Sequence, residues 1–417
     1  MTKLWLFCFP LLFLPNFGLG HETPYGVIEV SDLVIVPFVL LLLIAPSIDQ
    51  HHKISQVKLI LLAFIVWASL STVTIQARYD YLDAIPVLVT CSVKLAKLML
   101  YATAGILIST KLISPGVRTQ WFWSLLAAIL MLSVGLILSI NGERSEVMDN
   151  VAGYKSYNSI IISMVILLSF IAGLWIDNAA SQNWRVAALT FGGFAIAAVL
   201  LSASLDAHGR GGWLALIIGC GYIVWKKTRR TKAFGIALLL GLMGFTAYKT
   251  LPNFKSVVDV TISSSDDDNE SRVSGVDEGA RVSTWEHEAP KLIDAPLLGT
   301  GFYHRGGPAG LWETGSHNFF IQMFLETGVV GGILVIMVFA LMWRQAGSAS
   351  SKRARISVAT RAALITAIVG GMSGEYFYGN ITVLVLFAVF ACAGAGRSET
   401  APGSEEISHR AWQRIAL

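Results

Sequence analysis

Apolar runs long enough to cross a lipid bilayer recur along this chain, and they constrain its fold more than any other feature. A transmembrane helix needs about 20 predominantly apolar residues. Only 14% of the 417 residues are charged and the mean hydropathy is +0.62, whereas a water-soluble domain carries about 25% charged residues. So few charges cannot cover the surface of a soluble globule. The sequence therefore predicts an all-α polytopic membrane protein.

Twelve segments fit this pattern, so we expect about 12 transmembrane helices. The first segment has a second interpretation, because a basic start, an apolar run and small residues are also typical of a cleaved signal peptide. Its removal would leave the orientation of every later helix unchanged. The predicted spans are residues 4–20, 31–48, 58–76, 84–109, 120–140, 159–176, 186–205, 211–225, 233–250, 318–343, 358–374 and 379–396.

The distribution of Lys and Arg orients these helices. Cytoplasmic loops of membrane proteins are enriched in both residues. With the N-terminus in the cytoplasm, 19 of the 31 basic residues fall in cytoplasmic segments. The short loops on the other side hold only Arg78, Arg144, Lys155 and Arg210. We therefore expect a multi-pass membrane protein with both termini in the cytoplasm. The net charge of +4 follows from this topology and does not indicate nucleic-acid binding.

One long loop, residues 250–317, separates the ninth and tenth predicted spans on the periplasmic side. It divides the chain into helices 1–9 (residues 1–249) and helices 10–12 (residues 318–396), which a cytoplasmic tail (residues 397–417) follows. Residues 279–292 read as an amphipathic helix, and Pro296-Leu-Leu-Gly-Thr-Gly301 is rich in turn formers. Because this is the one long external segment, we expect it to carry the functional face.

Two arginines on the expected periplasmic side could bind an anion. Arg210 lies in Gly209-Arg-Gly-Gly-Trp213, where glycines allow a bulky ligand to approach the backbone. Arg281 opens the predicted loop helix and shares a helix face with Trp285 and Glu288. Either guanidinium could bind phosphate in bidentate fashion. The alternatives are an Arg that reaches to lipid headgroups at 210 and an ordinary surface helix at 281.

His317 stands where the long loop re-enters the membrane, in Gly315-Ser-His-Asn-Phe-Phe320. An imidazole titrates near neutrality and can accept a proton from a reacting hydroxyl. A capping or headgroup-contacting role is the alternative. Glu326 is a poor partner, because nine residues along a continuous helix put the two side chains on opposite faces.

Lys94 and Lys97 lie three residues apart within the fourth predicted span, on one helix face. Charges inside a membrane usually face a polar cavity, so they could line a path for an anionic ligand, or they could pair with an internal Asp or Glu. Asp266-Asp-Asp268 could hold a divalent ion, but its Ser, Asn and Glu neighbours favour a solvated loop. The sequence has no phosphate-binding Gly-Lys-Ser/Thr loop, so we expect no nucleotide. We expect no metal or other cofactor either.

These features together resemble the bacterial O-antigen ligase and O-antigen polymerase superfamily. The matching motifs are Gly209-Arg-Gly-Gly-Trp213, then Arg281 and Trp285, then Pro296–Gly301, then His317-Asn318 with Glu326-Thr-Gly328. Their order, spacing and common sidedness carry the resemblance over roughly residues 200–345. It implies a GT-C-like, helical membrane glycosyltransferase whose donor is a glycan linked to undecaprenyl diphosphate.

The family's functional residues map onto Arg210, Arg281 and His317, as two diphosphate-binding arginines and a candidate base. The acceptor that the resemblance implies is lipid A-core, as for a ligase of compact length with a single long loop. The same motifs occur in O-antigen polymerases and in protein-targeting oligosaccharyltransferases, which stay open. A transporter or flippase is a further alternative for twelve helices. As candidate substrate-binding residues we add Asn318, Lys94, Lys97 and Trp285.

Overall fold

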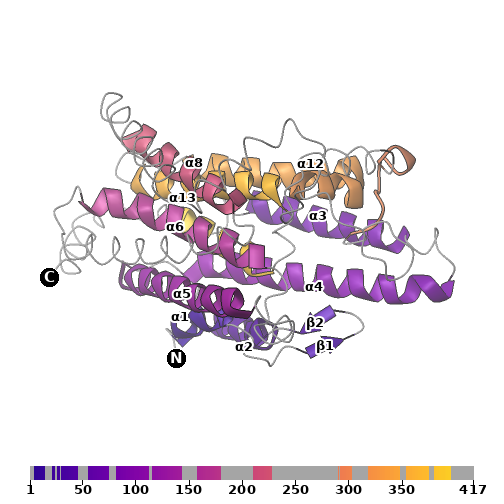
Figure 1. Cartoon of the computed structure of the whole chain (residues 1–417), viewed down its shortest axis with the longest axis horizontal. Coiled ribbons are helices and arrows are strands. Elements are labelled where there is room, and N and C mark those ends of the chain that lie inside the picture. Colours follow the sequence, from indigo (N-terminus) through magenta and orange to yellow (C-terminus); the bar gives the residue numbers. More distant parts are fainter. Residues whose placement is uncertain are drawn as a thin grey trace, which may run out of the picture.

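The computed structural model is mainly helical, and most of its helices run roughly along the long axis of the molecule (Figure 1). An antiparallel hairpin of β1 (His21–Thr23) and β2 (Gly26–Ile28) precedes the second helix. The structure describes residues 4–14, 21–23, 26–28, 30–45, 55–74, 81–111, 115–142, 157–179, 210–227, 290, 292–302, 318–347, 354–374 and 380–395.

Helices occupy most of the predicted spans where the structure describes the chain. The first span, 4–20, is the exception, because its described part is a five-residue helix and a 3-10 turn that ends at Phe13, with Leu14 extended. Three of the described helices are long and apolar enough to cross a membrane, at Gln56–Val73, Leu88–Ile108 and Phe319–Gly347. The predicted spans at 186–205 and 233–250 lie outside the described residues, so the full set of twelve stays a prediction. The helices are α1 (Leu4–Cys8), the 3-10 turn η1 (Pro10–Phe13), α2 (Val30–Ile44), α3 (Ser55–Val73), α4 (Tyr81–Lys111), α5 (Pro115–Gly142), α6 (Tyr157–Ala179), α8 (Arg210–Lys227), α12 (Phe319–Gly347), α13 (Ala354–Ser373) and α14 (Asn380–Ala395).

Polar contacts fix α2 against α4 at both ends of α2. In its first turn, Asp32 forms an ion pair with Lys97 and accepts a hydrogen bond of 3.2 Å from the Tyr101 hydroxyl. Directly after the last turn of α2, the carbonyl of Ala45 accepts a hydrogen bond from the Lys111 ammonium. The negative end of the helix dipole also stabilises a cation at this position. Burial lowers the pKa of Lys111. The two helices therefore run parallel, as their predicted orientation requires.

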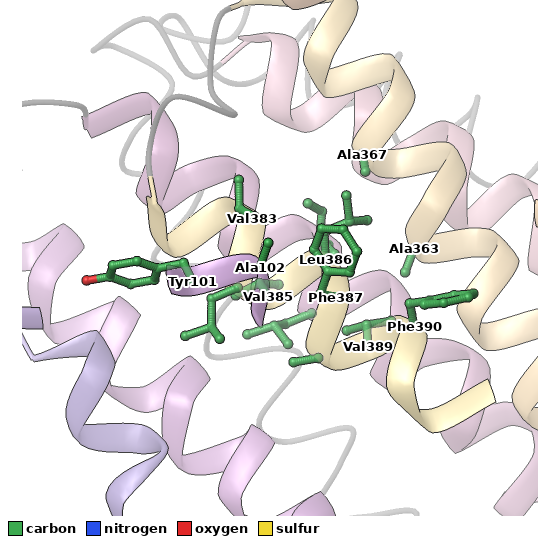
Figure 2. Close-up of a cluster of buried hydrophobic side chains, with 14 of the residues drawn as sticks. Tyr101, Ala102, Ala363, Ala367, Val383, Val385, Leu386, Phe387, Val389 and Phe390 are labelled. Carbon is green, nitrogen blue, oxygen red and sulfur yellow. The ribbon is translucent and has the colours of Figure 1, made fainter. Parts of the chain in front are cut away.

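The core of the bundle is built on α6 and α14, whose described side chains are almost all buried. Figure 2 shows α14 between α4 and α13, with Phe387 and Phe390 pointing into the space beside Ala102 and Ala363. Hydroxyl pairs join buried faces of neighbouring helices, as between Ser163 and Thr382 at 3.1 Å. Helices that are apolar on every face are typical of the inside of a membrane bundle.

Small residues let these helices approach closely. A methyl group added at Gly105 of α4 would lie 2.3 Å from the Cβ of Phe387, and one at Gly173 of α6 would lie 2.6 Å from the Cα of Ala359. Contacts between membrane helices depend on van der Waals packing, because lipid tails give no hydrophobic driving force. The glycines therefore set the spacing between α4 and α14 and between α6 and α13.

We expect Gly173→Ala to destabilise the protein by about 1–3 kcal/mol, the usual cost of overpacking a core. Gly221→Ala in α8 is the matched control, because a methyl group there meets nothing within 4 Å. The measurement is the midpoint of thermal unfolding in detergent micelles. Equal midpoints for the two variants would contradict the α6–α13 packing.

Candidate active site

α12 is broken at Gly328, whose φ of 69° and ψ of −176° are not helical. The ring centroids of Phe320 and Phe339 lie only 5.6 Å apart, although 19 residues of continuous helix rise about 28 Å. A methyl group at Gly332 would likewise lie 2.5 Å from the Phe324 ring. The short half (residues 319–327) therefore folds back along the long half (residues 329–347). This differs from the single span expected at 318–343.

At the end of the short half, backbone carbonyls have no N–H partner within the helix. The turn-rich segment before Phe302 supplies N–H groups that bind these carbonyls. The N–H of Thr300 donates to the carbonyl of Leu325 at 2.9 Å, and that of Gly301 donates to Glu326 at 2.8 Å. In return, the N–H of Val329, at the start of the long half, donates 2.8 Å to the carbonyl of Pro296. The motif at 296–301 thus caps both helix ends at the break.

Two glycines make this approach possible. Gly299 and Gly328 both have left-handed backbones, with φ of 65° and 69°. A methyl group at Gly299 would lie 2.4 Å from the carbonyl of Glu326, and one at Gly328 would lie 2.0 Å from the carbonyl oxygen of Leu297. Each glycine therefore leaves room for the other segment's main chain. We call this contact between residues 296–301 and residues 325–329 the interlock.

α3 closes the interlock from a third side. The indole N–H of Trp67 donates 2.9 Å to the carbonyl of Thr327. The hydroxyl of Ser71 reaches the carbonyls of both Glu326 and Leu298, the first at 2.8 Å. Trp67 and Ser71 were not predicted from the sequence. Their spacing of four residues on one face of an apolar helix is the signal that could have found them.

The other end of the short half is fixed by Asn318. Its side-chain oxygen accepts hydrogen bonds from the N–H groups of Phe320 at 3.0 Å and Ile321 at 3.2 Å, so Asn318 is the N-cap of α12. A capping role accounts for this side chain, and its role in substrate binding stays a prediction. His317, the preceding residue, lies outside the described residues.

A buried polar pair lies on the short half. Glu326 is fully buried, and its Oε1 accepts a hydrogen bond of 2.7 Å from the amide of Gln322, one turn earlier. A carboxyl group inside a membrane protein is expensive to bury without a partner. Gln322 supplies such a partner from the same helix.

An apolar cavity lies beside the short half, between α3, α4, α12 and α14. Only apolar side chains line it. Phe302 and Phe319, which flank residues 303–318, are both in its wall. Phe302 packs edge-on against Phe64 of α3 at 6.3 Å. The residues directly before and after segment 303–318, which contains His317, thus both line an apolar cavity.

Of the remaining candidate residues, the structure describes the side chains of the two lysines but not those of Arg210, Arg281 and Trp285. α8 begins at Arg210, whose side chain is outside the described part of the chain, and Arg281 and Trp285 are outside it altogether. Lys94 is half-buried in α4. Lys97 pairs with Asp32, which is the internal pairing that the sequence left open. Among the described residues no three His, Cys, Asp or Glu side chains gather as a metal site, and residues 266–268 are not among them.

Comparison with known families identifies the segment that contains the interlock. Residues 194–336 match a family model described as O-Antigen ligase. This segment belongs to the O-antigen ligase/polymerase family. The match confirms the resemblance seen in the sequence motifs, and it covers about a third of the chain. No curated protein matches the chain.

The matched segment includes all three residues that the resemblance singled out, Arg210, Arg281 and His317. It also includes both partners of the interlock at 296–301 and 325–329. α3, which clamps the interlock, lies outside the match. The ligase-family segment of this chain is therefore held in shape by a helix from the N-terminal part of the chain.

We expect Gly299→Ala and Gly328→Ala each to destabilise the protein by more than about 2 kcal/mol. The left-handed backbone alone costs a non-glycine residue about 1–2 kcal/mol, and overpacking adds about 1–3 kcal/mol. Thermal unfolding of the purified protein measures the effect, with Gly221→Ala as the uncrowded control. A wild-type midpoint for both variants would show that the interlock is not formed.

We also expect Asp32→Asn to destabilise the protein more than the double variant Asp32→Asn/Lys97→Met. Removing one partner of this partly buried ion pair leaves the other charge uncompensated inside the bundle. Replacing both partners removes that charge. Thermal unfolding of the three proteins is the measurement. A double variant no more stable than the single one would mean that Lys97 serves another partner, such as an anionic substrate.

Proposed function

We propose that this protein transfers an O-antigen glycan from undecaprenyl diphosphate to a sugar of lipid A-core, on the periplasmic face of the inner membrane. The observation that carries the proposal is the O-Antigen ligase match at residues 194–336, which spans Arg210, Arg281 and His317. The family description favours a ligase over a polymerase. The apolar helices and the positive-inside pattern support a membrane enzyme that works on a lipid-linked donor.

The proposed reaction is a direct, inverting displacement at the anomeric carbon of the donor sugar. The acceptor hydroxyl oxygen forms the new bond to that carbon, while the bond from the carbon to the diphosphate oxygen breaks. His317 accepts the hydroxyl proton, a step worth about 10²–10⁴-fold in rate. Undecaprenyl diphosphate leaves as a stable anion that needs no protonation. The diphosphate bond supplies the driving force, so no nucleotide is consumed.

Arg210 and Arg281 stabilise the charge that develops on the leaving diphosphate. Donors placed in advance around a developing charge act without reorganising during the reaction. Because α8 begins at Arg210, this residue lies in the first helical turn, where the helix dipole also favours an anion. Two guanidinium groups suit a diphosphate, which carries more charge than one Arg neutralises. A metal ion is not required in this scheme.

The surroundings of the interlock support a lipid substrate. The apolar cavity reaches Phe302 and Phe319, and large apolar side chains on α3 such as Leu62 and Val66 are exposed. A lipid-linked donor has to keep its hydrocarbon chain in the membrane while its diphosphate meets cationic side chains.

We expect His317→Ala, Arg210→Ala and Arg281→Ala each to abolish or strongly reduce the capping of lipopolysaccharide. The variants are expressed at matched levels in a strain that lacks its O-antigen ligase, and the lipopolysaccharide is separated by gel electrophoresis. Arg144→Ala is the control, because Arg144 is a basic residue of an expected periplasmic loop outside the family segment. Wild-type capping by all three variants would make the assignment wrong.

The same system separates the other functions. A strain without a ligase accumulates long undecaprenyl-linked chains, whereas a strain without a polymerase caps the core with a single repeat. Purified protein that forms a covalent glycan product is not a flippase. Strict dependence of that product on a divalent cation would move the site toward Asp266–Asp268.

A further inference from the structure

We infer that Ser71 and Trp67 of α3 are positioning residues for the proposed site, because they hold the helix that presents His317. The inference rests on the proposed function, in which His317 is the base. Neither side chain belongs to the segment that matches the ligase family. What they contact is the C-terminal end of the short half of α12, through the carbonyls of Glu326 and Thr327.

The short half connects these contacts to His317 as a rigid lever. Its nine residues form about 13 Å of helix between the break at Gly328 and the N-cap at Asn318. His317 directly precedes Asn318 in the sequence. A movement of Asn318 at the end of the lever is therefore passed to His317 through a single planar peptide bond.

A small tilt at residues 326–327, the end of the short half that α3 holds, gives a large displacement at the other end, Asn318. A tilt of about 5° moves the far end of a 13 Å helix by about 1 Å. A misplacement of about 1 Å in a catalytic group can reduce the rate about 100-fold. The clamp is thus a natural place for a remote residue to control turnover.

Ser71 is the better placed of the two residues, because it joins both sides of the interlock. Its side chain is fully buried, and its one hydroxyl proton faces the carbonyls of Leu298 and Glu326. Removing the hydroxyl loosens the short half from the segment at 296–301 at the same time. Trp67 holds the next carbonyl, that of Thr327, from one helical turn earlier on α3.

A double-mutant cycle with full-length purified protein tests the inference. The variants are Ser71→Ala, His317→Ala and the combination, assayed for transfer of an undecaprenyl-diphosphate-linked glycan to lipid A-core. We expect Ser71→Ala to lower kcat by about tenfold or more, with the KM for the donor within about twofold of wild type. In the His317→Ala background, Ser71→Ala should cause no further loss, because residues that act through one group are not additive.

Ser69→Ala is the matched control. Ser69 lies on the same helix and is exposed. Its hydroxyl donates a hydrogen bond of 2.8 Å to the carbonyl of Ile65, one turn earlier in that helix. It should keep the wild-type kcat. If Ser71→Ala does not accumulate as folded protein, Trp67→Phe, which removes only the indole N–H from the clamp, takes its place in the cycle.

The outcomes separate the two claims. Full activity of His317→Ala alone would overturn the proposed role of the base. If His317→Ala lowers kcat, and the double variant loses activity by the product of the two single losses, the role of His317 as base stands. The positioning role of Ser71 is then overturned. A wild-type kcat for both Ser71→Ala and Trp67→Phe would overturn it as well.

Discussion

Backbone amides and carbonyls inside a membrane have no water to bind, so each must find a partner within the protein. The break at Gly328 creates that problem in the middle of an apolar run, where one helix ends and another begins. The interlock solves it with main-chain groups of residues 296–301 and with two side chains of α3. The conformation of α12 and the position of Asn318 both depend on these hydrogen bonds.

The same contacts join parts of the chain that are far apart in sequence. Trp67 and Thr327 are separated by 260 residues, and Ser71 and Glu326 by 255. α3 is therefore not simply one more lipid-facing helix of the bundle. Because it lies outside the segment that matches the O-antigen ligase family, the fold of that segment in this protein rests on helices that the family match does not cover.

Much of the helical architecture could be predicted, because a run of about 20 apolar residues in a membrane has few alternatives to a helix. The break could not, since hydropathy runs the predicted span 318–343 straight through Gly328 and glycine is frequent in membrane helices. Its conformation is set by Pro296 and Gly299, which hydropathy does not connect with it. Periodicity likewise gave Lys97 two interpretations, and only the fold brings Asp32 beside it. The motifs at 296–301 and 326–328 were recognised as a set, but not as contacting partners.

A broken helix also changes where the long loop ends. If residues 319–347 formed one straight helix, it would be about 43 Å long, against a hydrocarbon core of about 30 Å. With Arg344 at the predicted cytoplasmic end, Asn318 would then stand well above the opposite surface of the membrane. Folding back brings Phe320 beside Phe339, so the start of α12 lies alongside the long half instead. For the proposed reaction, whose donor diphosphate lies at the membrane surface, this geometry keeps the N-terminal end of α12 beside the long half rather than beyond the membrane.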